Sequence, residues 1–166
     1  MDPTELIARL RGVDPAALAD ADKSIRVIAP EIRPVRLGLT LLGPAYTVRC
    51  TNDFFAIIAA LEDARPGDVL VVDTQGSTCA VVGELFSLEA ARLGLGGIVI
   101  DGACRDLSTI RTLELPVYAR SITPVSGTVN AVTYCSAMTT GSSSPRRRSS
   151  SACCRPPRRS SKRKTR

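Results

Sequence analysis

The chain has 166 residues, none of them histidine or tryptophan, and only 4% are aromatic. Without an imidazole, neither a histidine acid–base pair nor a histidine zinc site can form. No apolar run reaches the roughly 18 residues that a membrane-spanning helix needs. The N-terminal Met1-Asp2-Pro3 also lacks the basic and apolar parts of a signal peptide. We therefore expect a cytoplasmic protein whose chemistry uses carboxylates, guanidinium groups and backbone amides.

The six cysteines do not have the paired spacing of a zinc site. Cys50, Cys79 and Cys104 lie in or beside segments that we expect to be buried. Cys153 and Cys154 are adjacent, which is a poor arrangement for holding a metal. We expect all six thiols to be reduced.

Strands and helices are predicted to alternate along the first two thirds of the chain, which indicates a single α/β domain. Helical patterns and buried apolar runs are separated by Gly, Pro and Asp turn signals. The predicted helices are Thr4–Arg11, Pro15–Lys23 and Asn52–Asp63, the last with Phe55, Ile58, Ala59 and Leu61 facing inward, and the predicted strands are Leu39–Leu42, Tyr46–Cys50 and Val69–Asp73.

The segment from Gly83 to Asp106 is the most informative part of the sequence. A helix over Ser87–Leu93, opened by Gly83, leads into Gly97–Ile100, an apolar β-branched run typical of a strand covered on both faces. Asp101-Gly102 is a turn signal that would end this strand. Ligands collect beyond the carboxyl ends of strands in open α/β sheets, so we expect a site here.

Arg105 and Asp106 follow that strand, and Glu84 stands in the first turn of the helix. Each has an ordinary explanation, because Glu84 suits the positive end of a helix and Arg105–Asp106 could be a solvated ion pair. Together they form a rarer combination. The free amides of Gly83, Glu84, Leu85 and Phe86 could bind a carboxylate or enolate oxygen beside them.

From Leu6 to Val129 the sequence resembles the regulator of ribonuclease E activity A family, which includes class II 4-hydroxy-4-methyl-2-oxoglutarate aldolases. The matching motifs occur in the family's order and spacing. They are Leu42–Cys50, Pro66–Asp73, Gly83–Leu85, Asp101–Asp106 and Pro116–Pro124. The resemblance implies one layered α/β domain with a central buried sheet, similar to swivelling phosphohistidine domains.

The resemblance also implies a metal-dependent lyase. Such an enzyme cleaves 4-hydroxy-4-methyl-2-oxoglutarate, or 4-carboxy-4-hydroxy-2-oxoadipate, to pyruvate and a 2-oxo acid, and decarboxylates oxaloacetate. Both reactions pass through a pyruvate enolate that a divalent cation stabilises. Carboxylate and water ligands favour Mg²⁺ or Mn²⁺ over zinc. With no histidine present, a metal-bound water is the expected proton carrier.

Carried over by position, the resemblance gives each residue of the segment a role. Asp106 would hold the metal largely through waters, and Glu84 would help to orient the hydrated ion. Arg105 would bind the pyruvate oxygens, and the amides from Gly83 to Phe86 would bind the carboxylate. The resemblance also implies a homotrimer, in which a carboxylate from the C-terminal region of the neighbouring subunit supports the metal.

The last 26 residues reverse the charge of the chain. Residues 1–140 contain 12 Lys and Arg against 16 Asp and Glu, whereas residues 141–166 contain ten basic residues and no acid, giving +6 overall. This basic tail has almost no apolar side chain, so we expect it to be disordered. Taken alone, it indicates a nucleic-acid-binding tail whose affinity falls with salt.

A shifted reading frame is our preferred explanation of the tail. One set of codons for residues 137–144, read two bases out of frame, encodes Asp-Asp-Asp-Gly-Ile-Val-Val, which the family carries near this point. We therefore divide the chain into a family domain at 1–130, whose C-terminal portion is missing, and a low-complexity tail at 131–166. An in-frame gene sequence through this region would contradict the hypothesis.

Two other functions stay open. Some relatives bind an endoribonuclease and inhibit RNA turnover, so the chain could be a non-catalytic regulator. A nucleic-acid binder rests on the tail alone. A menaquinone-pathway methyltransferase is not supported, because the chain has no glycine-rich loop between a strand and a helix.

Overall fold

The structure is a computed structural model that describes residues 3–128 and 138–139. The predicted domain boundary at 130 and the basic tail at 141–166 lie outside the described residues. Of the segment 131–166, which we assign to a shifted reading frame, only residues 138 and 139 are described. Within the described ranges, no helix is both long and apolar enough to cross a membrane. The helices are α1 (Pro3–Leu10), α2 (Pro15–Ala21), α3 (Phe55–Asp63), α4 (Glu84–Arg92) and α5 (Leu107–Ile110).

The described strands form one mixed sheet. They are β1 (Arg33–Pro34), β2 (Ala45–Arg49), β3 (Val69–Asp73), β4 (Ala80–Val82), β5 (Gly97–Cys104), β6 (Val117–Ile122) and β7 (Met138–Thr139). The strand order is β1-β6-β5-β3-β2-β7, with β4 paired to β5. Strands β6, β5, β3 and β2 run parallel, and β1 and β7 are antiparallel edge strands. The α/β fold with a central sheet is confirmed.

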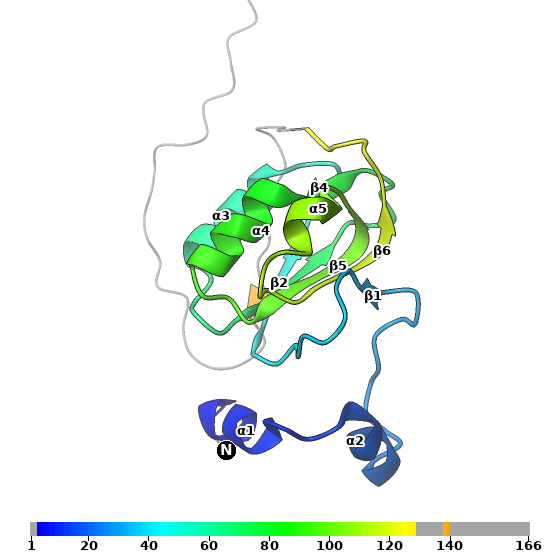
Figure 1. The fold of residues 1–166 in the computed structure, drawn as a ribbon, viewed down its shortest axis with the longest axis vertical. Coiled ribbons are helices and arrows are strands. Elements are labelled where there is room, and N and C mark those ends of the chain that lie inside the picture. The colour runs from blue at the N-terminus through cyan, green and yellow to red at the C-terminus, as the bar shows by residue number, and fades with distance from the viewer. Residues whose placement is uncertain (1–2, 129–137, 140–166) are drawn as a thin grey trace, which may run out of the picture.

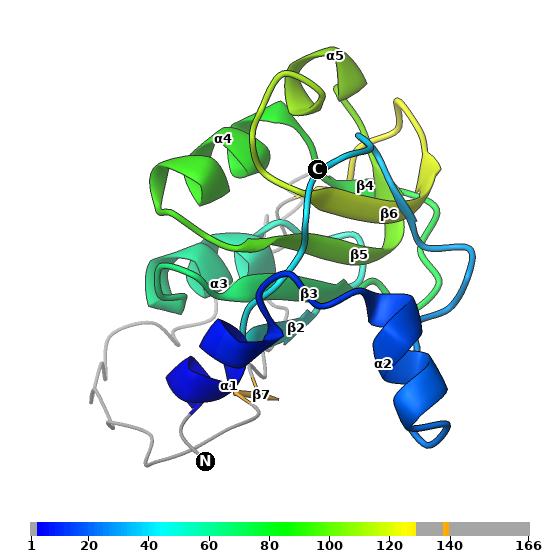
Figure 2. The ribbon, with the colours of Figure 1, turned by 60° about the horizontal axis from the view of Figure 1, so that its bottom comes forward.

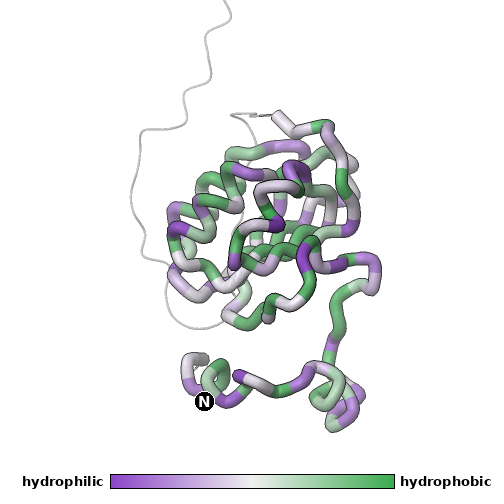
Figure 3. The backbone as a smooth tube through the Cα atoms, viewed as in Figure 1, coloured by the Kyte–Doolittle hydropathy of each residue, from purple (hydrophilic) through white to green (hydrophobic). Residues whose placement is uncertain are grey.

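Helices α3 and α4 lie side by side over one face of this sheet, with α5 next to α4 (Figures 1 and 2). Alternate strand residues, among them Leu70, Val72, Ile98 and Ile100, are fully buried in one cluster with the inner faces of these helices. Figure 3 shows the hydrophobic residues concentrated along the central strands and the adjoining helices. Burying each such side chain contributes about 1.5–3 kcal/mol, so the sheet firmly supports the segments at the ends of its strands.

Helices α1 and α2 stand outside this body (Figure 1). Both begin at a proline, and in α2 the side chain of Asp14 accepts a hydrogen bond from the Ala16 amide at 2.9 Å. Both helices end one or two residues before their predicted ends. The predicted strand at Leu39–Leu42 is wrong, because these residues form no strand.

Helix α3 begins at Phe55 rather than at Asn52, because the Asp53 carboxylate accepts a hydrogen bond from the Phe55 amide at 2.9 Å. Its predicted inner face is partly wrong. Phe55 and Ile58 are 45% and 39% exposed. The buried positions of this helix are Ala56, Ile57, Ala60 and Leu61.

The predicted turn at Asp101-Gly102 is also wrong, because β5 continues through it to Cys104. The Asp101 carboxylate pairs with Arg120 on the neighbouring strand. A Cβ on Gly102 would lie 2.4 Å from Thr74 Oγ1. This glycine therefore marks a close approach of two segments of the chain and not a turn.

Candidate functional site

Strands β4 and β5 end beside each other, and this fixes the site. Val82 pairs with Cys104 in parallel register, so the chain leaves both strands at the same edge of the sheet. The Arg105 amide then donates a hydrogen bond to the Val82 carbonyl at 3.1 Å. Gly83–Phe86 and Arg105–Asp106 are thereby brought together, as the sequence predicts.

Asp106 joins the two segments directly. Its Oδ2 accepts a hydrogen bond from the Glu84 amide at 3.1 Å and lies 3.2 Å from Arg105 Nε. The backbone of Asp106 is left-handed, with φ 57°, which is uncommon for a residue other than glycine. Such a conformation persists only where the surrounding contacts hold it. Here the left-handed backbone of Asp106 directs its own carboxylate toward the start of α4.

Gly83 makes this close approach possible. A Cβ at this position would lie 2.4 Å from Asp106 Oδ2 and 2.9 Å from Arg105 Cγ. Its backbone is extended, so another residue could adopt the conformation but not fit the space. The glycine therefore creates the contact between the Arg105–Asp106 segment and α4.

Two backbone donors remain at the start of α4. The Glu84 amide, which we expected to bind a substrate carboxylate, is already occupied by Asp106. The amides of Leu85 and Phe86 donate to no acceptor among the described residues. Amides at the positive end of a helix dipole can bind an anion, so these two stay candidates for the predicted carboxylate contact.

The Glu84 side chain is exposed and makes no ion pair with any described residue. Arg105 and Asp106 are only partly exposed, at 38% and 36% of their side-chain surface. The side chains of Glu84, Arg105 and Asp106 therefore lie together at a partly exposed edge of the domain, which we call the rim. The catalytic, substrate-binding and metal-binding roles assigned to them, and those of the Gly83–Phe86 amides, stay predictions.

A cavity of about 110 Å³ opens at this rim. Its walls are Phe54, the segment Ala80–Phe86, Arg105 and Asp106. Phe54 was not among the predicted site residues. It lies outside the Gly83–Phe86 and Arg105–Asp106 segments, and only the tertiary fold brings its ring to within 5.6 Å of the Phe86 ring, centroid to centroid.

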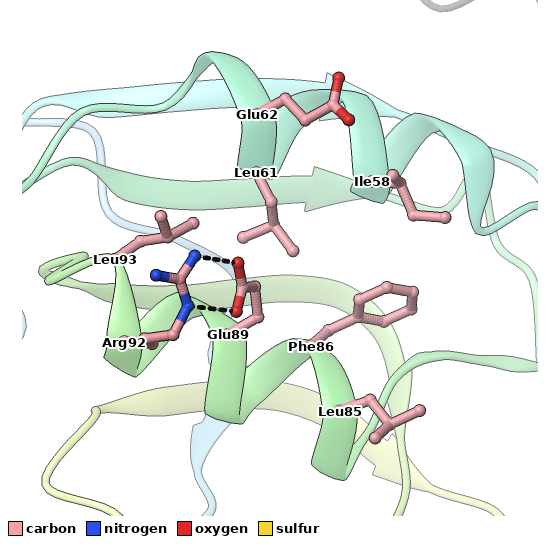
Figure 4. Close-up of a pocket in the computed structure, with 8 residues that line it drawn as sticks. All are labelled: Ile58, Leu61, Glu62, Leu85, Phe86, Glu89, Arg92 and Leu93. Carbon is pink, nitrogen blue, oxygen red and sulfur yellow. Dashed lines mark hydrogen bonds and ion pairs between the residues drawn. The ribbon is translucent and has the colours of Figure 1, made fainter.

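A larger hollow of about 410 Å³ lies between α3 and α4 and shares Leu85 and Phe86 with the smaller one (Figure 4). Glu62 is one of its charged side chains, and the other two, Glu89 and Arg92, are joined by hydrogen bonds of 2.6 and 2.7 Å. Because those groups satisfy each other, we place the candidate site in the smaller cavity, where guanidinium, carboxylate and amide groups converge.

The donor set fits a hard divalent cation that keeps most of its waters. Asp106 Oδ1 accepts no hydrogen bond from the described residues, and the Asp106 side chain is 36% exposed. No group of three His, Cys, Asp or Glu residues within the described ranges could enclose a metal. Mg²⁺ is commonly held by one or two carboxylates and several waters, whereas zinc sites need three or four protein ligands.

The cysteines of the described region take no part in this site. Cys79 and Cys104 are free thiols, and Cys50 and Cys104 are buried. Burial raises the pKa of Cys104 to about 11. This thiol is therefore protonated near neutral pH and structural in character.

The fold and the site together define a class: an α/β domain in which the start of α4 faces an Arg-Asp segment. The RraA-like family, described as Aldolase/RraA, matches residues 15–139. The chain belongs to this family.

A curated relative from Halalkalibacterium halodurans bears the name "Putative 4-hydroxy-4-methyl-2-oxoglutarate aldolase". It is 32% identical over 121 residues, covering 72% of this chain and 58% of the relative. The chain therefore spans less than two thirds of that relative's length.

Two solved structures share the fold. One, from Geobacillus kaustophilus, is called an S-adenosylmethionine:2-dimethylmenaquinone methyltransferase; it is 28% identical with a TM-score of 0.68, covering 75% of this chain and 78% of its own. The other, Streptomyces coelicolor RraAS2, is described as an unusual member of the RNase ES inhibitor RraA family. It is 30% identical with a TM-score of 0.61, covering 74% of this chain and 65% of its own.

Proposed function

We propose that the chain carries the site of a divalent-metal-dependent carbon–carbon lyase. Its substrate class is a 4-hydroxy-2-oxo diacid such as 4-hydroxy-4-methyl-2-oxoglutarate or 4-carboxy-4-hydroxy-2-oxoadipate, with oxaloacetate decarboxylation as a second reaction. The observation that carries the proposal is the hydrogen bond between the Glu84 amide and Asp106 Oδ2. It brings a carboxylate, a guanidinium and two remaining helix amides to one small cavity.

The arrangement suits the groups that a 2-oxo acid presents. The Arg105 guanidinium would bind the carboxylate and keto oxygens, since its donors form a fork that matches such a pair. The amides of Leu85 and Phe86, at the positive end of α4, would bind the other oxygen of the substrate carboxylate. The substrate is then held with its negative charges on the polar wall of the cavity.

In retro-aldol cleavage the hydroxyl proton leaves and a new carbonyl forms as the carbon–carbon bond breaks. The electron pair of that bond passes to the pyruvate fragment as an enolate, which takes a proton at C3 to give pyruvate. Arg105 would stabilise the developing charge on the enolate oxygen. Asp106, with Glu84 beside it, would hold a divalent cation that supplies further positive charge there. Because the chain has no histidine, water would be the carrier of both protons.

Pyruvate release tests the proposal. The full chain with Mg²⁺ and oxaloacetate, or with the methyl-oxoglutarate substrate, should release pyruvate faster than the metal-only background. Asp106→Ala and Arg105→Ala should abolish this release. Arg111→Ala is the matched control, because Arg111 is exposed and lies outside the cavity. Release that is unchanged in the two site variants would overturn the assignment.

A protein-binding role is the second candidate, and the likeness to Streptomyces coelicolor RraAS2 favours it. On this chain Leu85 and Leu88 of α4 are 76% and 42% exposed. Such apolar side chains could contact an endoribonuclease. A pull-down with an RNase E-type enzyme that Leu85→Glu abolishes, in the absence of pyruvate release, would support this role over catalysis.

A further inference from the structure

We propose that Phe54 is a positioning residue for the substrate carboxylate: its ring packs against Phe86 and thereby fixes the direction of the Leu85 and Phe86 amides. This inference rests on the proposed function and deepens it. Phe54 acts through Phe86 and not on the reacting atoms.

The first turn of α4 has few side-chain attachments. The side chains of Glu84 and Leu85 are exposed, Leu85 to 76%. Phe86, by contrast, is partly buried and packs against the hydrophobic core. The centroid of its ring lies 5.6 Å from that of Phe54, and the ring planes are tilted by 57°, a favourable aromatic geometry. Of the three side chains that open this helix, Phe86 is therefore the one that anchors the turn.

The backbone of Phe54 is itself fixed on both sides. Its amide donates a hydrogen bond to the Thr128 carbonyl at 3.0 Å, and the Thr128 amide donates to the Asn52 carbonyl at 2.7 Å. The two segments approach so closely that a Cβ on Gly127 would lie 2.8 Å from the Asn52 oxygen. The Phe54 carbonyl accepts a hydrogen bond from the Ile58 amide at 3.0 Å. The Phe54 ring is therefore a firm support for Phe86.

The start of α4 is held from two sides. Asp106 accepts the hydrogen bond from the Glu84 amide at 3.1 Å, and Phe54 supports Phe86 from the start of α3. The amides of Leu85 and Phe86 belong to the turn between these two contacts. Because a hydrogen bond weakens steeply as it departs from linearity, a small rotation of the turn would weaken the contact with a carboxylate. Removing the Phe54 ring would release one contact and leave Asp106 in place.

This role predicts different effects on KM and kcat. The substrate carboxylate carries the same charge before and during bond cleavage, whereas new charge develops on the enolate oxygen near Arg105. A weakened amide contact therefore affects substrate and transition state equally, which raises KM and leaves kcat unchanged. Phe54→Ala should raise KM for oxaloacetate about tenfold, the lower end of what one hydrogen bond to a charged group supplies.

Steady-state pyruvate release by the full chain with Mg²⁺ tests this, together with amide NMR titration by pyruvate. In Phe54→Ala the shifts that pyruvate induces at the Leu85 and Phe86 amides should shrink. Phe54→Leu keeps an apolar contact with Phe86, so it should hold KM within about threefold of wild type and guards against a folding defect. Phe55→Ala is the matched control and should leave KM unchanged, because Phe55 is 45% exposed and does not line the cavity.

A double-mutant cycle separates support of Phe86 from direct contact with the substrate. Phe86→Ala removes the ring but keeps the amide. If Phe54 acts through Phe86, adding Phe54→Ala to Phe86→Ala should change KM by less than about twofold. A further rise of about tenfold in the double variant, or an unchanged KM in Phe54→Ala alone, would overturn the inference while wild-type pyruvate release upholds the proposed function. If wild type releases no pyruvate above the metal-only background, the proposed function fails and this inference fails with it.

Discussion

Replacing Gly83 by alanine is the most specific perturbation of the site that the structure offers. The new Cβ would lie 2.4 Å from Asp106 Oδ2, while ordinary contacts begin near 3.4 Å. The carboxylate must therefore move by about 1 Å, the difference between these distances. That movement stretches the hydrogen bond from the Glu84 amide beyond its present 3.1 Å. A hydrogen bond to a charged group contributes about 1.5–3 kcal/mol, and partial exposure of Asp106 places the loss near the lower end.

The functional effect should exceed the loss of stability. A misplacement of about 1 Å at a reacting centre can lower the rate by about a hundredfold. We expect Gly83→Ala to lower metal-dependent pyruvate release by this factor while the far-UV circular dichroism stays that of the wild type. The NMR signal of the Glu84 amide should also shift.

Gly38→Ala serves as the control for stability. Gly38 has φ +84° with no atom near its missing Cβ, so alanine there costs about 1–2 kcal/mol of backbone strain without touching the site. It should lower the thermal midpoint and leave pyruvate release per folded molecule unchanged. If Gly83→Ala retained release within twofold of wild type, the argument that Asp106 must sit against α4 would be refuted.

Four further predictions concern other parts of the chain. Gly102→Ala should destabilise the fold by about 1–3 kcal/mol in urea unfolding, because its Cβ would meet buried Thr74; an unchanged midpoint would contradict the packing of β5. At pH 8 iodoacetamide should alkylate Cys79 well before Cys104, and equal rates would contradict the raised pKa of Cys104. Since the Cys104 pKa is raised in the folded state only, its contribution to stability should be lost as pH rises from about 9 to about 11. Deleting residues 141–166 should abolish any salt-dependent RNA binding, and affinity that survives the deletion would exclude the tail as its source.

The sequence predicts the central part of the fold well, for an identifiable reason. Val69–Asp73 has the buried β-branched pattern of a parallel strand, and the structure shows it with those bounds. Where the pattern is less distinctive, prediction fails. The apolar run of α3 contains almost no polar residue to mark its outer side, so Phe55 was placed inward although it is 45% exposed.

The site was predictable as far as local motifs reach. The Arg-Asp segment follows the strand predicted at Gly97–Ile100. The strand before the Gly-Glu helix start, β4, is not predicted, and its parallel pairing with β5 brings the two segments together. Two features depend on three-dimensional distances that no local pattern encodes. One is the occupation of the Glu84 amide by Asp106, and the other is the Phe54 ring in the cavity wall.

The central claim is that a divalent cation and a 2-oxo acid share the cavity beside Asp106. Paramagnetic broadening by Mn²⁺ of assigned amide signals, recorded on the full chain with pyruvate, tests this most directly. The account predicts broadening centred on Gly83–Phe86 and Arg105–Asp106, and its loss in Asp106→Ala. Broadening centred elsewhere, for example at the paired residues Asp73 and Asp101 of β3 and β5, would contradict it.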